Sequence, residues 1–174
     1  MDSTLPLTPA HKQARQSWAK THVTMGKEWD GVIFSDEKRF NLDGLDAYKD
    51  YWHDLWRSPR ETVRRQNGGG SVMIWAAFSA KGKSEMALLV GKQASEHYVY
   101  TLSEYLLPFA HLHYGADFIY QQDNASIHTS EETTAFLEDQ QVIVMKWPAR
   151  SPDLNPIENL WSMLAAKYMP TVVV

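Results

Sequence analysis

Three acidic residues, Asp36, Asp123 and Glu158, occupy positions from which they could act together. Asp36 and Asp123 each follow a short apolar run that is typical of a buried strand, and Glu158 falls in the first turn of an expected helix. Open α/β sheets place their sites at strand ends and helix starts. Three carboxylates at one point repel each other unless cations lie between them. Mg²⁺ suits such a group, and two ions about 4 Å apart can activate an attacking oxygen and stabilise a leaving one at a phosphodiester.

Each carboxylate also has an explanation that involves no chemistry. Asp36 begins the charged run D-E-K-R, which could be solvated surface at a strand end, and Asp123 with the asparagine after it could form an Asx turn. With Asn155 as N-cap, Glu158 would stand where glutamate closes a capping box and suits the helix dipole. Asp153 is a nearby competitor for either role. The residues alone leave these alternatives open.

Residues 53–70 form a basic segment beside an acidic body. The net charge of −4 conceals this contrast, because residues 71–140 hold three lysines against nine acidic residues, whereas 53–70 has a balance of +2. The segment carries Pro59, three consecutive glycines and no periodicity, which predicts a long functional loop. Its arginines could neutralise phosphates, although a basic loop is commonly only solvated; they are Arg57, Arg60, Arg64 and Arg65. His128 could contact a phosphate or orient a ligand, or could be ordinary polar surface.

The order of expected elements predicts a mixed α/β domain. Caps are expected at Thr8, at Ser95 and at Thr129 with Glu132, and Pro108 should kink or shorten a helix. Helices are expected at 8–21, 95–113, 129–140 and 155–167, and strands at 31–35, 38–42, 48–52, 71–79, 84–90, 117–122 and 142–145, the last of them buried. We therefore expect a single domain, residues 1–174, with a mixed central sheet flanked by helices.

Composition excludes several classes of protein. The chain has no cysteine, which removes disulfide scaffolds, thiolate metal sites and cysteine nucleophiles. The longest apolar run is far too short to span a bilayer, and the first residues lack the pattern of a secretory signal. We expect a soluble intracellular domain with no membrane partner and no organic cofactor.

Four sequence blocks resemble the catalytic core of mariner-type (Tc/mariner) DDE transposases, and 34 residues between Asp123 and Glu158 match the branch with two aspartates and a glutamate. The resemblance runs from about residue 6 to residue 167. The blocks are S-D-E-K-R-F at 35–40, G-G-G-S-V-M-I-W at 68–75, Q-D-N-A at 122–125 with His128, and W-P-A-R-S-P-D-L-N-P-I-E-N-L-W at 147–161.

The resemblance implies a ribonuclease-H-like fold in which Asp36, Asp123 and Glu158 are the catalytic residues and hold two Mg²⁺ ions, with Mn²⁺ able to substitute. The implied reaction is phosphodiester hydrolysis at transposon ends, followed by attack of the freed 3′-hydroxyl on target DNA at TA sites. The segment 53–70 falls where relatives carry a clamp that reaches a partner subunit and DNA. We add His128 and Arg150 to its arginines as expected DNA contacts.

The resemblance further implies a nuclear protein that acts on transposon-end and target DNA, as a homodimer in its full-length form. Relatives carry N-terminal helix-turn-helix modules and continue beyond the position of Glu158, so we expect a catalytic-domain fragment, or a degenerate copy that lost both ends, without specific end recognition. Two alternatives remain: a ribonuclease-H-like nuclease that cuts without joining, and a catalytically silent, transposon-derived module that binds DNA or dimerises.

Overall fold

The computed structural model describes residues 7–42 and 70–168, so the expected strand at 48–52 and the basic segment up to residue 69 lie outside the described part. None of the described helices is long and apolar enough to cross a membrane. The elements are α1 (Pro9–His22), η1 (Lys27–Gly31), β1 (Val32–Asn41), β2 (Ser71–Ser79), β3 (Gly82–Lys83), β4 (Ala87–Leu89), α2 (Ser95–Thr101), η3 (Leu102–Leu106), α3 (Leu107–Tyr114), β5 (Ile119–Gln121), α4 (Glu131–Asp139), β6 (Ile143–Val144), η4 (Pro152–Leu154) and α5 (Ile157–Tyr168).

The sheet is mixed, as the sequence predicts, and β1 lies at its centre. Its strand order is β3-β2-β1-β5-β6, with β4 paired to β2. Phe34 of β1 lies opposite Phe78 in the antiparallel pair with β2, and opposite Gln121 in the parallel pair with β5. The two strands expected at 31–35 and 38–42 are one continuous strand, because its charged residues remain in register with β2.

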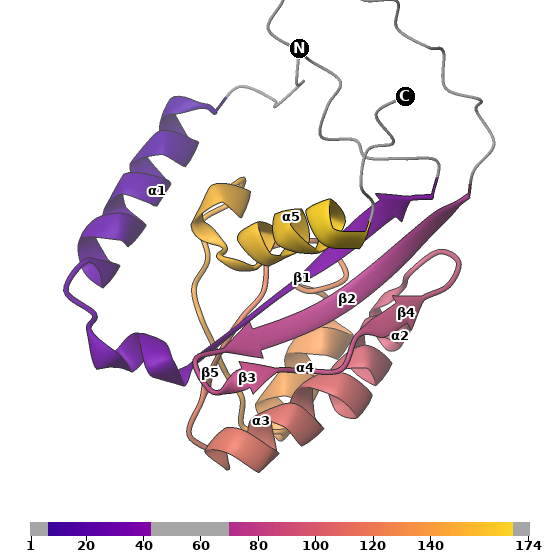
Figure 1. Cartoon of the computed structure of the whole chain (residues 1–174). Coiled ribbons are helices and arrows are strands. Elements are labelled where there is room, and N and C mark those ends of the chain that lie inside the picture. Colours follow the sequence, from indigo (N-terminus) through magenta and orange to yellow (C-terminus); the bar gives the residue numbers. More distant parts are fainter. Residues whose placement is uncertain (1–6, 43–69, 169–174) are drawn as a thin grey trace, which may run out of the picture.

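Helices cover both faces of this sheet (Figure 1). Period-two alternation sends Ile33 into one face, where α2, η3, α3 and α4 pack, and sends Val32 and Phe34 into the other. On that second face α1 and the segment before α5 supply tryptophans, while α5 packs Ile157 and Trp161 against Phe40. The residues of β1 therefore alternate between two environments, and the polar residues of this strand are divided between the same two faces.

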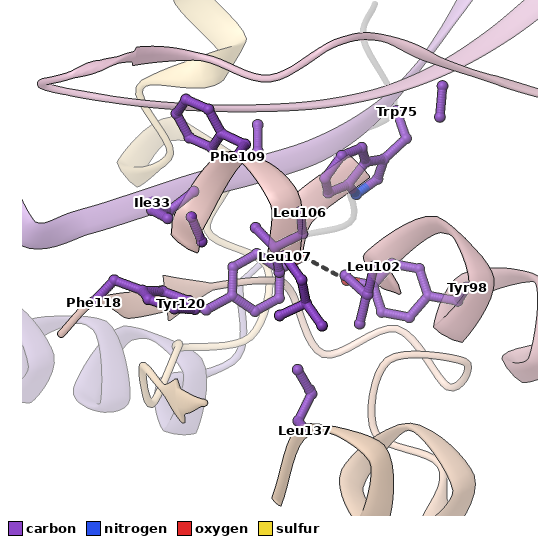
Figure 2. Close-up of a cluster of buried hydrophobic side chains, with 13 residues drawn as sticks. Ile33, Trp75, Tyr98, Leu102, Leu106, Leu107, Phe109, Phe118, Tyr120 and Leu137 are labelled. Carbon is purple, nitrogen blue, oxygen red and sulfur yellow. Dashed lines mark hydrogen bonds between the residues drawn. The ribbon is translucent and has the colours of Figure 1, made fainter. Parts of the chain in front are cut away.

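The larger core lies under α2, η3 and α3 (Figure 2). Leu102, Leu106, Tyr120, Trp75 and Ile33 are fully buried there. Burial of one such side chain stabilises the fold by about 1.5–3 kcal/mol, so this cluster is a rigid support for the strand ends above it.

Residues 95–114 stay helical throughout, where the sequence predicts a kink or an early end at Pro108. The chain passes from α2 through the π-helical segment η3 into α3, and Pro108 falls in the first turn of α3. A proline has no N–H to donate to the preceding turn of an α-helix. The i→i+5 hydrogen bonds of the π-helical segment before Pro108 accommodate the missing bond. Ala94 is the N-cap where Ser95 was expected, and its N–H donates to Nδ1 of His97 at 3.1 Å.

Other local predictions have mixed outcomes. Thr8 caps α1 as expected, its hydroxyl accepting from the N–H of His11. The cap of α4 is Ser130 and not Thr129, because the Ser130 hydroxyl accepts from the N–H of Thr133. The strand expected to be buried at 142–145 shrinks to β6, an edge strand whose Ile143 is 62% exposed.

Asn155 begins the last helix and also ties it to β1. Its Oδ1 accepts from the N–H of Ile157 at 3.3 Å, and its Nδ2 donates to the Ser35 carbonyl at 3.0 Å. Asn155→Ala should lower the free energy of unfolding by about 2 kcal/mol, because a cap and a buried hydrogen bond are both lost. Urea denaturation measures this loss, with the exposed Asn159→Ala as control; equal stability of the two variants would contradict the assignment.

Candidate active site

The strands bring Asp36 and Asp123 to the same level of the sheet. Phe34 and Gln121 are the last paired residues of β1 and β5. Asp36 lies two residues beyond Phe34, and Asp123 lies two residues beyond Gln121, so the parallel register carries both carboxylates to one end. Glu158 approaches from the first turn of α5, which packs on β1.

Asp36 is held in a crowded and partly buried environment. Its Oδ2 accepts a hydrogen bond from Nε1 of Trp161 at 3.2 Å. Burial raises the pKa of Asp36 to about 7, and the negative charges of Glu158 and Glu37 act in the same direction, against the Trp161 hydrogen bond. Strong perturbation by burial and neighbouring like charges is typical of functional carboxylates.

Glu158 is paired with Lys38, which lies on the same face of β1 as Asp36. The Lys38 Nζ donates to Oε2 of Glu158 at 2.9 Å, and both side chains are partly exposed. An ion pair this open contributes about 1 kcal/mol or less, so an approaching cation can displace the ammonium.

Asp123 is oriented by two donors on the loop that follows β5. Its Oδ1 accepts from the N–H of Ala125 at 2.8 Å and lies 2.7 Å from Nδ1 of His128. The hydrogen bond with His128 lowers the pKa of Asp123, outweighing the effect of burial. Burial lowers the pKa of His128, but its bonds with Asp123 and Glu37 outweigh that effect and raise it to about 9. His128 is therefore an imidazolium at neutral pH, and both of its nitrogens donate.

The residues expected to contact DNA lie in three different settings, and their contact with DNA stays a prediction. Arg57, Arg60, Arg64 and Arg65 lie outside the described residues. Arg150 is exposed and has a left-handed backbone, with φ 56°; its carbonyl accepts from Arg15, which also pairs with Asp153. His128, in contrast to the expected phosphate contact, is only 4% exposed, and carboxylates occupy both ring nitrogens.

Sequence reasoning missed Lys38, Glu37 and Trp161 as site residues. All three lie inside the motif blocks of the resemblance. For Glu37 and Lys38, the alternation of side chains along an extended strand could have shown which of them shares a face with Asp36. Residues 36 and 38 point toward α5, whereas residue 37 points toward the opposite face and His128.

The three carboxylates suit a hard divalent cation by their chemistry. Within residues 7–42 and 70–168, no three His, Asp or Glu side chains are grouped closely enough to hold a metal ion. Glu158 bonds with Lys38, and Asp123 with His128. Yet oxygen donors are the ligands that Mg²⁺ prefers, and a cation would offset the burial and the negative charges of Glu158 and Glu37 that together raise the pKa of Asp36. The chemistry of the three carboxylates therefore fits a divalent cation.

Comparison with known proteins identifies the class. Residues 31–170 match the family model described as DDE superfamily endonuclease, and the chain belongs to this family. The fold class is the ribonuclease-H-like one that the resemblance implied.

The chain is also homologous to transposases. It is 45% identical over 172 residues to the Tc3 transposase of Caenorhabditis elegans, covering 95% of this chain and 52% of the relative. The Mos1 strand transfer complex superposes with a TM-score of 0.75 at 20% identity, covering 93% of this chain and 49% of that one. The Mos1 catalytic domain, solved with Mg, gives 0.64 at 17% identity, with 93% and 76% covered. This chain thus spans about half the length of the Tc3 transposase.

Proposed function

We propose that this domain cuts and joins DNA strands as the catalytic part of a transposase. Asp36, Asp123 and Glu158 hold two Mg²⁺ ions, which Mn²⁺ can replace, and the substrates are transposon ends and target DNA at TA sites. The observation that carries the proposal is that β1, β5 and α5 bring Asp36, Asp123 and Glu158 to one end of the sheet, where burial and the charges of Glu158 and Glu37 raise the pKa of Asp36. Membership of the endonuclease family supports the same chemistry.

Each carboxylate has a hydrogen-bonding neighbour. The Trp161 N–H fixes one oxygen of Asp36, His128 and the Ala125 N–H fix one oxygen of Asp123, and Lys38 holds Glu158. When bound, the metal ions supply activation of the attacking oxygen and stabilisation of the leaving one. The protein contributes positioning, which fixes reacting groups in line.

The proposal extends to the setting of the full-length protein. We propose a homodimer that acts in the nucleus, with the arginines of the 53–70 segment and Arg150 contacting DNA phosphates. Such contacts predict affinity that falls steeply with salt.

Cleavage of labelled duplex DNA by the 174-residue chain in Mn²⁺ tests the proposal. Asp36→Asn, Asp123→Asn and Glu158→Gln should each abolish cleavage while the circular dichroism spectrum stays unchanged. Asp153→Asn is the matched control, because Asp153 pairs with Arg15 away from the carboxylates. Cleavage retained in one of the three variants would remove that residue from the mechanism.

The products separate the proposal from its alternatives. Joined strands on a gel support a transposase, whereas cut strands that are never joined favour a ribonuclease-H-like nuclease. DNA binding without turnover in either Mg²⁺ or Mn²⁺ would favour a silent module.

A further inference from the structure

His128 bridges two carboxylates from different segments, Asp123 on the loop after β5 and Glu37 of β1. Its Nδ1 lies 2.7 Å from Oδ1 of Asp123, and its Nε2 lies 3.2 Å from Oε1 of Glu37. The imidazole is 4% exposed, whereas the Asp123 side chain is 56% exposed. A buried and doubly bonded ring therefore helps the Ala125 N–H to hold an exposed carboxylate.

Tyr98 of α2 holds the ring of His128 in turn. The two rings stack with centroids 4.0 Å apart and planes 28° apart. The Tyr98 hydroxyl donates to Oε1 of Gln122 at 2.8 Å, and Nε2 of Gln122 donates to the carbonyl of His128 at 3.1 Å. Tyr98 thus fixes both the ring and the backbone of the histidine.

The chain of hydrogen bonds continues into the core beneath the site. The Tyr98 hydroxyl also lies 2.9 Å from the Tyr120 hydroxyl, the contact drawn as a dashed line in Figure 2. Tyr120 lies 2.7 Å from the hydroxyl of Ser35, which donates to the Gln121 carbonyl. Ser35 precedes Asp36, and Gln122 precedes Asp123, so one buried network reaches the backbone beside both aspartates. Buried polar networks that are satisfied in this way rigidify their surroundings.

We propose that His128 and Tyr98 are positioning residues that hold Asp123 in the orientation needed for a metal ion. This inference rests on the proposed function and assigns these residues a task within it. The bonded oxygen is Oδ1, and it accepts from both His128 and Ala125, so Oδ2 of the exposed carboxylate is left for the ion. Both nitrogens of the buried His128 ring contact carboxylates, at the atoms with which the ring was expected to contact a phosphate.

Two amide substitutions separate the two contacts of His128. The amide nitrogen of asparagine falls near the position of Nδ1, and that of glutamine near Nε2. His128→Asn therefore keeps a donor for Asp123, whereas His128→Gln keeps one for Glu37 only. His22→Gln is the matched control, because His22 also stacks on an aromatic ring and bonds through Nδ1, to the Trp18 carbonyl.

Mn²⁺ affinity by calorimetry and amide hydrogen exchange of Ala125 by NMR are the two measurements. His128→Gln should weaken Mn²⁺ binding about 10- to 100-fold, as loss of a ligand-orienting partner typically does. It should also speed exchange of the Ala125 amide, whose acceptor is the freed Asp123 carboxylate. His22→Gln should remain close to wild type in both, and His128→Asn, which keeps a donor for Asp123 but loses the stacked ring, should fall between wild type and His128→Gln.

Tyr98→Phe keeps the stacked ring and loses the hydroxyl. It should weaken Mn²⁺ binding about fivefold, the effect of one hydrogen bond. Tyr114→Phe is its control, because it loses a hydroxyl that donates to the Asp30 carbonyl at 2.7 Å, in the η1 segment that precedes β1.

The outcomes are decisive in each direction. Equal Mn²⁺ affinity and equal Ala125 exchange in His128→Gln and His128→Asn would overturn the positioning role. A wild-type chain that binds no Mn²⁺ would refute the metal function, and the exchange of Ala125 would then still decide whether His128 orients Asp123.

Discussion

Asp36→Asn should make the metal-free protein more stable above pH 7 while abolishing metal-dependent cleavage. Burial and the charges of Glu158 and Glu37 raise the pKa of Asp36 from 3.8 to about 7 in the folded chain. A carboxylate with a raised pKa stabilises the fold below its unfolded pKa, and this contribution is lost as the pH rises through the folded value. At pH 8 the folded protein therefore carries a buried and repelled charge that asparagine lacks.

The size of this effect follows from the shift. One pKa unit corresponds to about 1.4 kcal/mol, and solvent relaxation reduces the total, so we expect a gain of about 2 kcal/mol at pH 8. Near pH 5 the gain should be smaller, because this pH lies between the unfolded and folded pKa values and only part of the contribution has been lost. Urea denaturation of wild type and variant at both pH values measures the difference.

Glu158→Gln provides the matched control for this prediction. It removes one of the repelling charges, so it should stabilise the protein at pH 8 by less than Asp36→Asn does. A destabilisation by Asp36→Asn that is equal at pH 5 and pH 8 would contradict the account of the site as a set of mutually repelling carboxylates.

Trp161→Ala should lower the free energy of unfolding by about 3–5 kcal/mol, the usual cost of removing a buried tryptophan ring. Trp161 is 3% exposed and packs edge-on against Phe40, with centroids 5.9 Å apart. The substitution leaves a cavity between α5 and the sheet, and it removes the donor to Asp36. Thermal or urea unfolding checks the loss, and a loss below about 1 kcal/mol would contradict the packing.

Trp161→Phe separates packing from hydrogen bonding. Phenylalanine keeps most of the ring but cannot donate to Asp36, and that hydrogen bond lowers the pKa of Asp36. Mn²⁺ competes with the proton on this carboxylate, so binding by the variant should require a higher pH than binding by wild type. Trp18→Phe is the control, because Nε1 of Trp18 donates to the Lys146 carbonyl away from the carboxylates; a shift as large in this variant would exclude a specific role for Trp161.

Local sequence patterns predict most of this fold because they rest on contacts close in sequence. The proline after Thr8, the apolar run in 71–79 and the Asn-Pro pair before α5 each predict their elements. The sequence did not predict that β1 continues through its charged residues. Pairing with β2 keeps these residues extended, and the local sequence of β1 does not show that β2 is its partner. The π-helical η3 was missed for a similar reason: packing on the core keeps residues 95–114 helical through Pro108.

The candidate site, too, was predicted from the sequence only in part. The acidic triad is predicted from types, spacing and the family resemblance, whereas its role as metal ligands stays a prediction. The partners of its members come from distant parts of the chain: Lys38 reaches Glu158 across 120 residues, and Trp161 reaches Asp36 across 125. The sequence places these residues in motif blocks, and only the packing of α5 on β1 shows which side chains meet.

A crystal soaked in Mn²⁺, with the ions located by anomalous scattering, tests the central claim most directly. The account predicts a peak between Asp36 and Asp123, with Glu158 released from Lys38 and turned toward the ion. An unoccupied site in a crystal fully exposed to Mn²⁺, with Glu158 still bonded to Lys38, would contradict it and would favour the silent module.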